Sequence, residues 1–513
     1  MSARDEDIYA LFEAVESALG EKFKELGSSA EKSHGLSDLL RNAHDVTMLL
    51  EKIKAQEELI KKSADLSPSK VDGKGGVTTA TATIPQKTLH SKDDMMRAEQ
   101  IQKLCDLYDE KSSIAEKMRM EEVMDEHKEI HPLNKEACPI CLQDVPITSL
   151  DSVQYFCCCG NFMCFQCFQD AFAGGQMRMK NCPCCRGDLL VTTKKTVRHV
   201  ETQAKKGRPW AQTQLGIYYL QGSSCEHGEA VHHKVDIKEA LKWLKLAAEN
   251  NFPQAIRNIA ELHGGVHGEV KEVEQCQIKA RALMKEAADL GNLRAQRNYA
   301  MFCRLGQGGP VDKSEAAHYY TLAYAQKGLS FEKDEVSPLD FSDDFSEEIL
   351  HAGLFLGIYH YQGEGGLTKN LHIAKHYLEE HIKESEKQRE HVTADAYMYL
   401  AACLMELNKN FFHGICSIPG YSPVPRAMSL YRKSIQLGID NPRESSEFSK
   451  GVLGQMVAQL KVKCGNCGVA AEDTPEGRLK ECSRCHSAWY CGKECQTEHW
   501  KAGHKSDCVR QQV

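Results

Sequence analysis

Residues 211–222 read AQTQLGIYYLQG, and residues 236–248 read DIKEALKWLKLAA. Small residues such as Gly216 let two helices approach each other closely, whereas a large residue such as Trp243 fills the layer between successive pairs. Gly222, at the end of the first stretch, is the residue type that ends a helix and opens a turn. Together the two stretches predict a pair of packed helices. A single pair cannot bury its apolar face, so neighbouring pairs must stack on it.

The same pattern of residues returns along the chain. Its leading alanines, Ala211, Ala255 and Ala295, are 44 and 40 residues apart. That period is typical of a solenoid of paired helices. A fourth copy and a weaker fifth follow, after an insert at residues 331–348. The residues that mark these two copies are Ala352, Leu356, Gly357, Tyr361, Gly363, Ala374 and Tyr377, then Ala396, Leu400, Ala427, Tyr431 and Gly438.

The arrangement A-x3-L-G-x2-Y-x2-G…D-x3-A-x2-W-x3-A-A resembles the Sel1-like repeat, a relative of the tetratricopeptide repeat. The resemblance covers roughly residues 209–440 and implies an α-solenoid, whose bounds we set at residues 205–445. A generic α-helical domain, in which alanine and glycine recur by chance, is the alternative.

Cysteines are concentrated in two places. Of the 23 in the chain, ten lie between Cys138 and Cys185 and seven between Cys464 and Cys508. The N-terminal residues lack the basic start and apolar core of a secretory signal, so paired Cys-x2-Cys units indicate metal sites rather than disulfides. We therefore expect an intracellular protein of the cytoplasm or nucleus.

Charge and hydropathy argue against two classes of function. The formal net charge is -8, which does not favour binding to nucleic acid. No basic recognition helix of the groove-reading kind stands out either. The chain has no run of eighteen or more apolar residues, so we expect no membrane span.

The first cysteine-rich region, residues 133–192, holds three Cys-x2-Cys units and a run of adjacent cysteines, Cys157–Cys159. Zinc takes four thiolate or imidazole ligands in a tetrahedron, and a Cys-x2-Cys turn supplies two of them. The region therefore provides eight ligands, enough for two ions. An all-disulfide module is the alternative. The three units are Cys138 with Cys141, Cys164 with Cys167, and Cys182 with Cys185.

The order and spacing of these cysteines resemble a RING finger. The resemblance implies a cross-brace, in which the first and third ligand pairs share one ion. The ligands of the first ion would be Cys138, Cys141, Cys164 and Cys167, and those of the second Cys182, Cys185 and two residues of the run Cys157–Cys159.

One corner departs from the family pattern. Asn161 stands where the family has a zinc-binding histidine, and an asparagine side chain is a poor zinc ligand. A neighbouring cysteine must replace it. We expect Cys158, beside Cys159, with Cys157 as the alternative. Cys184, inside the last Cys-x2-Cys unit, is not expected to bind the ion.

RING fingers that act as ubiquitin ligases dock a ubiquitin-conjugating enzyme and hold its thioester-linked ubiquitin in a reactive pose, which is catalysis by positioning. The resemblance implies three docking residues. Ile140 takes the apolar contact position in the first Cys-x2-Cys unit, Pro183 lies in the last, and Arg186 follows the last ligand. A forked guanidinium suits hydrogen bonds to both the enzyme and ubiquitin. A RING fold used only as a scaffold is the alternative.

The second cysteine-rich region, residues 460–508, also provides eight ligands. Its tail, Y-C-x3-C-Q-x3-W…H-x3-C, closely resembles that of a MYND finger. We expect the last part to be helical, with His504 and Cys508 on one helical face, although the step from Trp500 to His504 is one residue longer than in the family. The resemblance gives one ion to Cys464, Cys467, Cys491 and Cys495 and the other to Cys482, Cys485, His504 and Cys508.

MYND fingers resembling this one bind short proline-containing peptides of partner proteins. Gln496 and Trp500 fall where the family forms its peptide groove. Trp500 is alternatively a core residue, because a small zinc module needs an apolar anchor. His499 is expected at the surface or beside the metal site rather than as a ligand. We find no signature of the SET methyltransferase domain that accompanies this finger in some enzymes.

The N-terminal part of the chain has three expected segments. Residues 1–63 form a helical region, residues 64–92 a flexible linker rich in Ser, Thr, Gly, Lys and Pro, and residues 93–132 a helical arm. The arm forms either a coiled coil or a solvated helix packed on the next domain.

The fold class is mostly α: an α-solenoid of Sel1-like helix pairs flanked by two small zinc-stabilised modules, with a helical N-terminal region.

These observations predict a zinc-binding protein-interaction protein that holds four zinc ions, two per module. The finer prediction is a RING-type ubiquitin ligase that recruits substrates through its repeats and its MYND finger. Its partners would be a ubiquitin-conjugating enzyme, proline-containing peptides and a substrate that the sequence does not identify. The alternative is a non-enzymatic adaptor whose three regions only bind proteins. Neither ligand set leaves an open coordination position for water, so the zinc ions build docking surfaces.

Overall fold

The computed structural model forms two compact units, one of Met120–Lys369 and one that joins Met1–Arg119 to Asn370–Val513. The expected helical region 1–63 and the linker 64–92, except its last residue, lie outside the described residues. Among the helices that are described, none is both long and apolar enough to cross a membrane. The structure describes residues 92–150, 153–172, 181–188, 193–222, 235–266, 273–328, 343–388, 392–411, 422–437, 444–508 and 510.

The first cysteine-rich module, in the unit Met120–Lys369, consists of two small hairpins and one helix. Strand β1 pairs antiparallel with β2, and β3 pairs antiparallel with β4. The short helix α4 follows β4 directly. The bounds are β1 Lys135–Ala137, β2 Asp144–Pro146, β3 Gln154–Tyr155, β4 Phe162–Met163 and α4 Phe165–Phe172.

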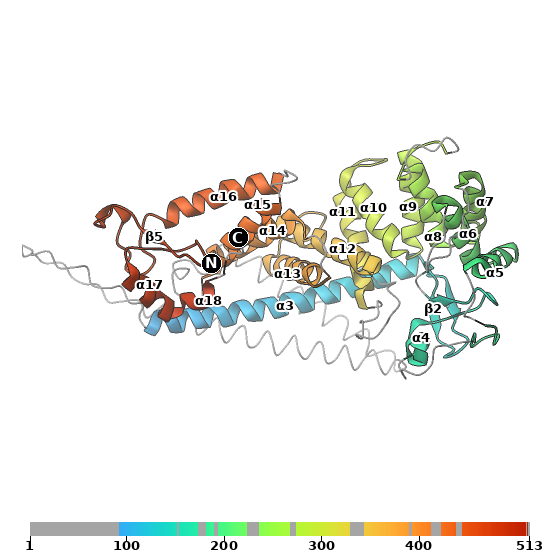
Figure 1. Ribbon diagram of the computed structural model, residues 1–513, viewed down its shortest axis with the longest axis horizontal. Helices are drawn as coiled ribbons and strands as arrows, with labels where there is room; N and C mark the ends of the chain where they lie inside the picture. The colour runs from blue at the N-terminus through green and yellow to red at the C-terminus, as the bar shows by residue number, and fades with distance from the viewer. Residues whose placement is uncertain are drawn as a thin grey trace, which may run out of the picture. The chain divides into compact units, whose positions relative to one another are not determined.

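Helices α5 to α12 of the same unit follow this module. Helix α6 packs on α7, α8 on α9, and α10 on α11, as the repeat pattern predicts. Figure 1 shows the green and yellow helices α6 to α11 side by side. The bounds are α5 Thr193–Lys205, α6 Pro209–Gln221, α7 Ile237–Ala248, α8 Pro253–His263, α9 Gln277–Asp289, α10 Leu293–Leu305, α11 Lys313–Ala325, η1 Gln326–Gly328 and α12 Asp343–Gln362.

Local chemistry explains where these helices begin and how closely they pack. Asp236 and Asp312 precede α7 and α11, and each side chain accepts a hydrogen bond from the backbone N–H three residues on, which satisfies a donor at the helix start. Gly222 ends α6 in the left-handed conformation. A Cβ added at Gly216 would lie 2.7 Å from Cγ of Leu244, so only glycine lets α6 approach α7 this closely.

Helix α12 extends into the expected insert at residues 331–348, which lies between the third and fourth repeats. Helix α12 already begins at Asp343. Glu348 is buried, and its carboxylate pairs with Arg297 and with Arg294 of α10. Two arginine partners stabilise a carboxylate inside the helical layer.

The second unit contains the remaining helix pairs and the second cysteine-rich module. Helices α13 and α14, α14 and α15, and α15 and α16 pack together. Ala396 and Ala427, which mark the weak fifth repeat, are fully buried on α14 and α15. The bounds are α13 Leu371–Gln388, α14 Ala394–Phe411, α15 Val424–Leu437, α16 Glu444–Leu460, η2 Ala471–Asp473, β5 Lys480–Glu481, β6 Trp489–Tyr490, α17 Lys493–His499, η3 Trp500–His504 and α18 Lys505–Asp507.

The expected helical arm is one helix, α3 (Lys92–Ile130), whose residues up to Arg119 belong to this second unit. There the Asp109 carboxylate contacts Nδ1 of His372 at 2.6 Å and Nζ of Lys375 at 2.6 Å. The Tyr377 hydroxyl donates to Glu116 at 2.7 Å. Helix α3 therefore packs on α13 through polar contacts, and the coiled coil stays a prediction.

Candidate metal centres

Two groups of cysteine sulfurs lie in the first module. The first group joins the first Cys-x2-Cys unit to the second, and the second joins the last unit to two cysteines of the run Cys157–Cys159. Within each group the ligand atoms lie within 4.8 Å of one another. This is the cross-braced grouping that the sequence predicts. The groups are Cys138, Cys141, Cys164 and Cys167, then Cys158, Cys159, Cys182 and Cys185.

The distances between sulfurs fit zinc and do not fit disulfides. Two thiolates on one zinc ion are about 3.8 Å apart, because each Zn–S bond is about 2.3 Å and the site is tetrahedral. The sulfur pairs of Cys141 and Cys164, and of Cys159 and Cys182, are 3.7 and 3.8 Å apart. A disulfide needs about 2.05 Å. All cysteines that the structure describes are free thiols, so the all-disulfide alternative does not hold there.

At the irregular corner around Asn161, the thiol of Cys158 lies with the second group of ligand atoms. Sγ of Cys158 lies 3.5 Å from Sγ of Cys185, whereas Cys157, Cys184 and the exposed Asn161 are outside both groups. Sγ of Cys157 is instead 4.0 Å from Nδ1 of His199 on α5. That Cys158 binds zinc stays a prediction, since the geometry shows only that its sulfur is in position.

Backbone N–H groups prepare the first thiol of each module for a metal ion. The N–H of Cys164 donates to Sγ of Cys138 at 3.4 Å, and that of Cys491 donates to Sγ of Cys464 at 3.4 Å. Burial opposes ionisation of Cys138, but the N–H donors of Cys164, Cys141 and Ile140 outweigh it and lower the pKa of Cys138 to about 6. The thiolate, which is the form that binds metal, is therefore favoured at neutral pH.

Four of the Cys-x2-Cys units share one backbone turn. In each, the residue directly after the second cysteine has a positive φ, and its N–H donates to the carbonyl of the first cysteine at 2.7–2.9 Å. Three of these residues carry side chains in a conformation that favours glycine, at a cost of about 1–2 kcal/mol each. Such strain persists where other bonds fix the geometry. The residues are Leu142, Arg186, Gly468 and His486.

The second module brings together the two ligand sets that the sequence predicts. One is Cys464, Cys467, Cys491 and Cys495, and the other is Cys482, Cys485, His504 and Cys508. Within them Sγ of Cys467 lies 3.6 Å from Sγ of Cys491, and Sγ of Cys485 lies 3.6 Å from Nε2 of His504. Burial and the adjacent thiols raise the pKa of Cys485. A bound zinc ion would favour the thiolate forms of these cysteines.

The expectation that His504 and Cys508 share one helical face was wrong. The helix kinks between Trp500 and His504, at Gly503, whose φ of 135° is not helical, and α18 ends at Asp507 before the ligand Cys508. Glycine adopts this backbone conformation without the steric cost of a side chain. The kink lies in the step from Trp500 to His504, which is one residue longer than in the family. The ligands meet because the chain bends there.

The expected peptide-groove residues are half-buried, and Trp500 packs against the core of the second module. The Trp500 ring packs edge-on against His504, and the guanidinium of Arg484 lies 5.5 Å above its centre. Gln496 is one turn away on α17. His499 is beside the metal group, as expected: it stacks on His504 at 5.0 Å and pairs with the Tyr490 hydroxyl at 2.9 Å.

Helix α15 holds the second module through one arginine. The Arg432 guanidinium donates to the carbonyls of Cys485 and His486 at 2.9 and 2.6 Å, and to the Ser487 hydroxyl at 3.1 Å. Since Cys485 belongs to a metal group, Arg432 fixes the turn that carries it.

Replacing Arg432 by alanine is therefore expected to loosen residues 482–488. Hydrogen bonds from a charged donor contribute about 1.5–3 kcal/mol, so amide exchange there should accelerate roughly ten- to hundredfold. Hydrogen-exchange mass spectrometry measures this. The neighbouring Lys433 pairs with the exposed Glu386 and lies over the Tyr397 ring of α14, away from the second module, so Lys433→Ala should leave exchange at residues 482–488 within about threefold of the wild type. Equal exchange in both variants would contradict the anchoring role.

The first module is packed on the helix pairs of its own unit. The Tyr155 ring stacks on Trp210 at 4.9 Å, and Nε1 of Trp210 donates to the Gly160 carbonyl at 3.3 Å. The Leu150 N–H donates to the Gln254 side chain at 2.6 Å. The module is thus held in a fixed orientation on α6 and α8.

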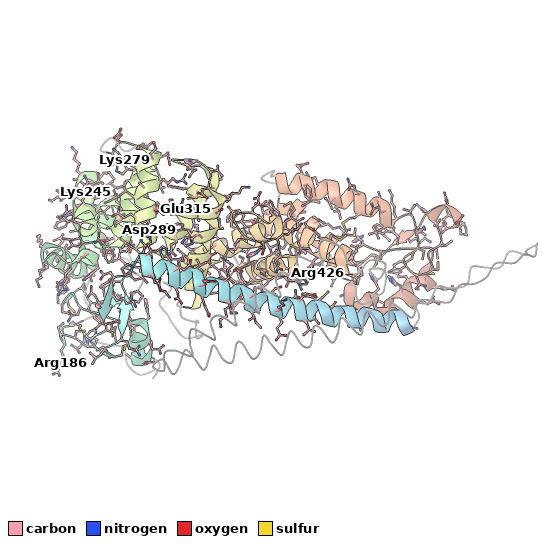
Figure 2. The ribbon with its side chains drawn as sticks, turned by 180° about the vertical axis from the view of Figure 1, so that it is seen from behind. Arg186, Lys245, Lys279, Asp289, Glu315 and Arg426 are labelled. Atoms are coloured by element: carbon pink, nitrogen blue, oxygen red, sulfur yellow. The ribbon has the colours of Figure 1, made fainter. Side chains whose placement is uncertain are left out.

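The three expected docking residues of the first module are all exposed. Ile140 is 49% exposed, and Pro183 and Arg186 are also classed as exposed. Figure 2 shows Arg186 at the outer edge of the module. Leu142, at 77% exposure, adds a second apolar side chain beside Ile140 that the sequence reasoning missed. Its position just after the Cys141 ligand is the signal that could have identified it.

Comparisons with known proteins assign two parts of the chain. The Sel1 repeat model matches residues 211–252, 253–292, 293–327 and 352–380, and the MYND finger model matches residues 463–508. Among solved structures, a Sel1 repeat protein of Oxalobacter formigenes is 18% identical, with a TM-score of 0.34, over 51% of this chain and 94% of that one. A protective antigen of uropathogenic Escherichia coli with an SLR fold is 17% identical, with a TM-score of 0.26, over 60% and 63%.

Curated relatives match only over short stretches. Ubiquitin carboxyl-terminal hydrolase 19 of Arabidopsis thaliana is 46% identical over 46 residues, 9% of this chain and 6% of that protein. A SET and MYND domain-containing protein of Dictyostelium discoideum is 42% identical over 53 residues, 10% of each. The chain thus spans a tenth or less of the length of these two relatives. Together with the four cysteine-rich groups, the matches show a zinc-binding protein that carries Sel1 repeats and a C-terminal MYND finger.

Proposed function

We propose that this protein is a RING-type ubiquitin ligase. The observation that carries the proposal is the first module. Its two cross-braced cysteine groups support a surface on which Ile140 and Leu142 stand exposed from one Cys-x2-Cys turn, with Pro183 and Arg186 exposed on another. Exposed apolar side chains beside a forked cation suit a protein partner.

In this mechanism the chain positions reactants and performs no covalent step itself. Ile140, Leu142 and Pro183 dock the conjugating enzyme, and Arg186 donates hydrogen bonds to it and to its bound ubiquitin. A substrate lysine amine then attacks the thioester carbonyl. An isopeptide bond forms, the thioester bond breaks, and the thiol of the conjugating enzyme leaves with the proton. Holding the reactants in this arrangement lowers the entropic barrier.

Substrate recruitment falls to the repeats and the MYND finger. Gln496 and Trp500 form the proposed site for a proline-containing peptide. Because Arg484 covers one face of the Trp500 ring, the peptide binds to the other face or displaces the guanidinium. For a substrate bound to the repeats of the same unit, the packing of the first module on α6 and α8 fixes the distance to the docked ubiquitin, which suits transfer to a limited set of lysines.

An autoubiquitination assay tests the proposal. Purified full chain with activating enzyme, a panel of conjugating enzymes, ubiquitin and ATP is expected to form chains. Ile140→Ala and Arg186→Ala should each reduce the rate at least roughly tenfold, the effect of about 1.4 kcal/mol of lost docking energy. Ile278→Ala is the matched control, because Ile278 of α9 is exposed (70%) and lies outside the module.

Zinc content, measured in parallel, shows whether each variant is folded. An absence of chains with every conjugating enzyme, in protein that retains its zinc, would support the adaptor instead. In that case the same surface only binds proteins.

A further inference from the structure

Two histidines and an aspartate meet outside the cysteine-rich groups. His127 lies in the last turns of α3, His131 follows one turn later, and Asp289 is the last residue of α9. All three belong to the unit Met120–Lys369. One ligand atom from each lies within 4.8 Å of the others. Histidines four residues apart at a helix end present their rings to the same side, and Asp289 faces them from α9.

The His127 ring is buried without a complete set of partners. The residue is only 6% exposed, and among the described residues its Nε2 has no hydrogen-bond partner. A buried nitrogen left without a partner costs about 1–3 kcal/mol, and such groups call for an explanation. A neutral imidazole nitrogen is a common metal ligand.

The Asp289 carboxylate is supported by its surroundings. The Tyr319 hydroxyl donates to its Oδ1, and Nζ of Lys285 lies 3.9 Å from the same atom. Nζ of Lys285 also forms an ion pair with Glu315, at 3.0 Å. Carboxylates that bind metals are commonly held by such outer hydrogen bonds, which fix their orientation.

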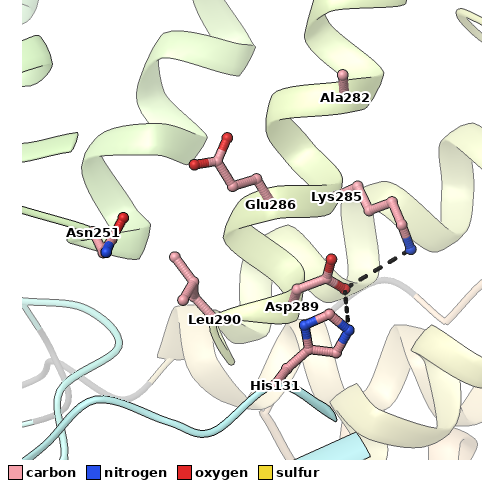
Figure 3. Close-up of a pocket in the computed structure, with 7 residues that line it drawn as sticks. All are labelled: His131, Asn251, Ala282, Lys285, Glu286, Asp289 and Leu290. Atoms are coloured by element: carbon pink, nitrogen blue, oxygen red, sulfur yellow. Dashed lines mark ion pairs between the residues drawn. The ribbon is translucent and has the colours of Figure 1, made fainter. Parts of the chain in front are cut away.

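A hollow of about 350 Å³ opens beside these groups, as Figure 3 shows, with His131, Lys285 and Asp289 in its wall. Three protein ligands leave one position of a tetrahedral ion free, and the hollow lets water or a side chain of a partner reach it. This differs from the cysteine-rich groups, each of which supplies four ligands.

We propose that His127, His131 and Asp289 form a fifth metal site, for a divalent cation of the zinc class. Two imidazoles and a carboxylate are ligands that zinc takes readily, at about 2.0–2.2 Å. Neighbouring ligands in such a site are about 3.4 Å apart, so the three side chains close in slightly on binding. The site lies at the C-terminal end of α3, directly before β1 and the first module. A bound ion there links this end of α3 to α9.

Cobalt titration of the intact protein tests the site. Full chain is desalted so that only the four cysteine-rich groups keep zinc, and Co²⁺ is then added. One equivalent is expected to bind, with visible d–d absorption but without the near-ultraviolet bands of a thiolate–cobalt bond. Zinc measured afterwards should still be four per chain, which separates this site from the cysteine-rich groups.

Three variants assign the ligands. His131→Ala and Asp289→Asn should each weaken Co²⁺ binding by at least roughly ten- to hundredfold, because loss of even an outer hydrogen bond has that effect at metal sites. His263→Ala is the control: His263 ends α8, outside the group, and should bind as the wild type does. His131 is partly exposed, so its variant is expected to fold. Failure of the wild type to bind Co²⁺, or unchanged binding by both ligand variants, would overturn the proposal.

Discussion

The Cys158→Ser variant is expected to hold three zinc ions in its cysteine-rich groups instead of four. Sγ of Cys158 is 3.5 Å from Sγ of Cys185 and belongs to the group that also contains Cys159 and Cys182. A serine hydroxyl is a hard, weakly acidic ligand, and zinc in structural sites takes thiolate or imidazole. The remaining three thiolates leave the second site of the first module incomplete. Native mass spectrometry of the desalted protein measures the number of ions directly.

Cys157→Ser and Cys184→Ser are the matched controls, and both are expected to keep four zinc ions. Each removes a thiol from the same few residues but from outside the ligand groups. Cys157 packs with the core of the neighbouring helix pairs, near His199, so its loss affects packing rather than metal. If Cys157→Ser loses an ion while Cys158→Ser retains all four, the assignment of this corner is reversed.

The ligands of the Cys-x2-Cys units could be predicted because the spacing is local. A turn of four residues places both sulfurs on one side, whatever the rest of the chain does. The corner at Cys157–Cys159 is different, because three adjacent thiols point in different directions and the backbone decides which two face the ion. Here Gln203 of α5 donates to the carbonyls of Cys157 and Cys158 at 3.3 and 3.4 Å. Helix α5 lies outside the cysteine-rich sequence, so the spacing of the cysteines carries no information about this contact.

The helix pairs could be predicted from small residues at fixed spacing, since Ala211, Ala255 and Ala295 are fully buried as the pattern requires. The start of α12 at Asp343 could not be predicted in this way, because it depends on the contacts of the Glu348 carboxylate with two arginines of α10. The proposed fifth metal site was missed for the same reason. Its Asp289 is far from the two histidines in sequence, and a lone pair of histidines four apart on a helix is a weak signal.

Removing zinc is expected to unfold the MYND finger completely. Structural zinc contributes about 10–16 kcal/mol of apparent binding energy in small finger peptides, as much as or more than the roughly 5–15 kcal/mol that stabilises a whole domain. Four of the five residues in the buried core cluster of this module are cysteines, Cys464, Cys482, Cys485 and Cys508, and the fifth is Tyr490. Trp489 is buried beside them, and Val469, Leu479 and Trp500 pack on the cluster only in part. Without the ion, four thiols are left at the centre of a core with few apolar side chains.

The first module is expected to retain part of its structure under the same treatment, because its hydrophobic contacts do not all depend on zinc. Ile147, Val153 and Phe162 belong to a core that continues into Trp210 and Leu215 of α6. After chelation at neutral pH, hydrogen-exchange mass spectrometry should show full loss of protection in β5 and β6 but only partial loss in β3 and β4, and the helix pairs should stay protected. Equal loss in both modules would mean that packing on the repeats contributes little. Protection retained in β6 would mean that zinc is not what holds the MYND finger together.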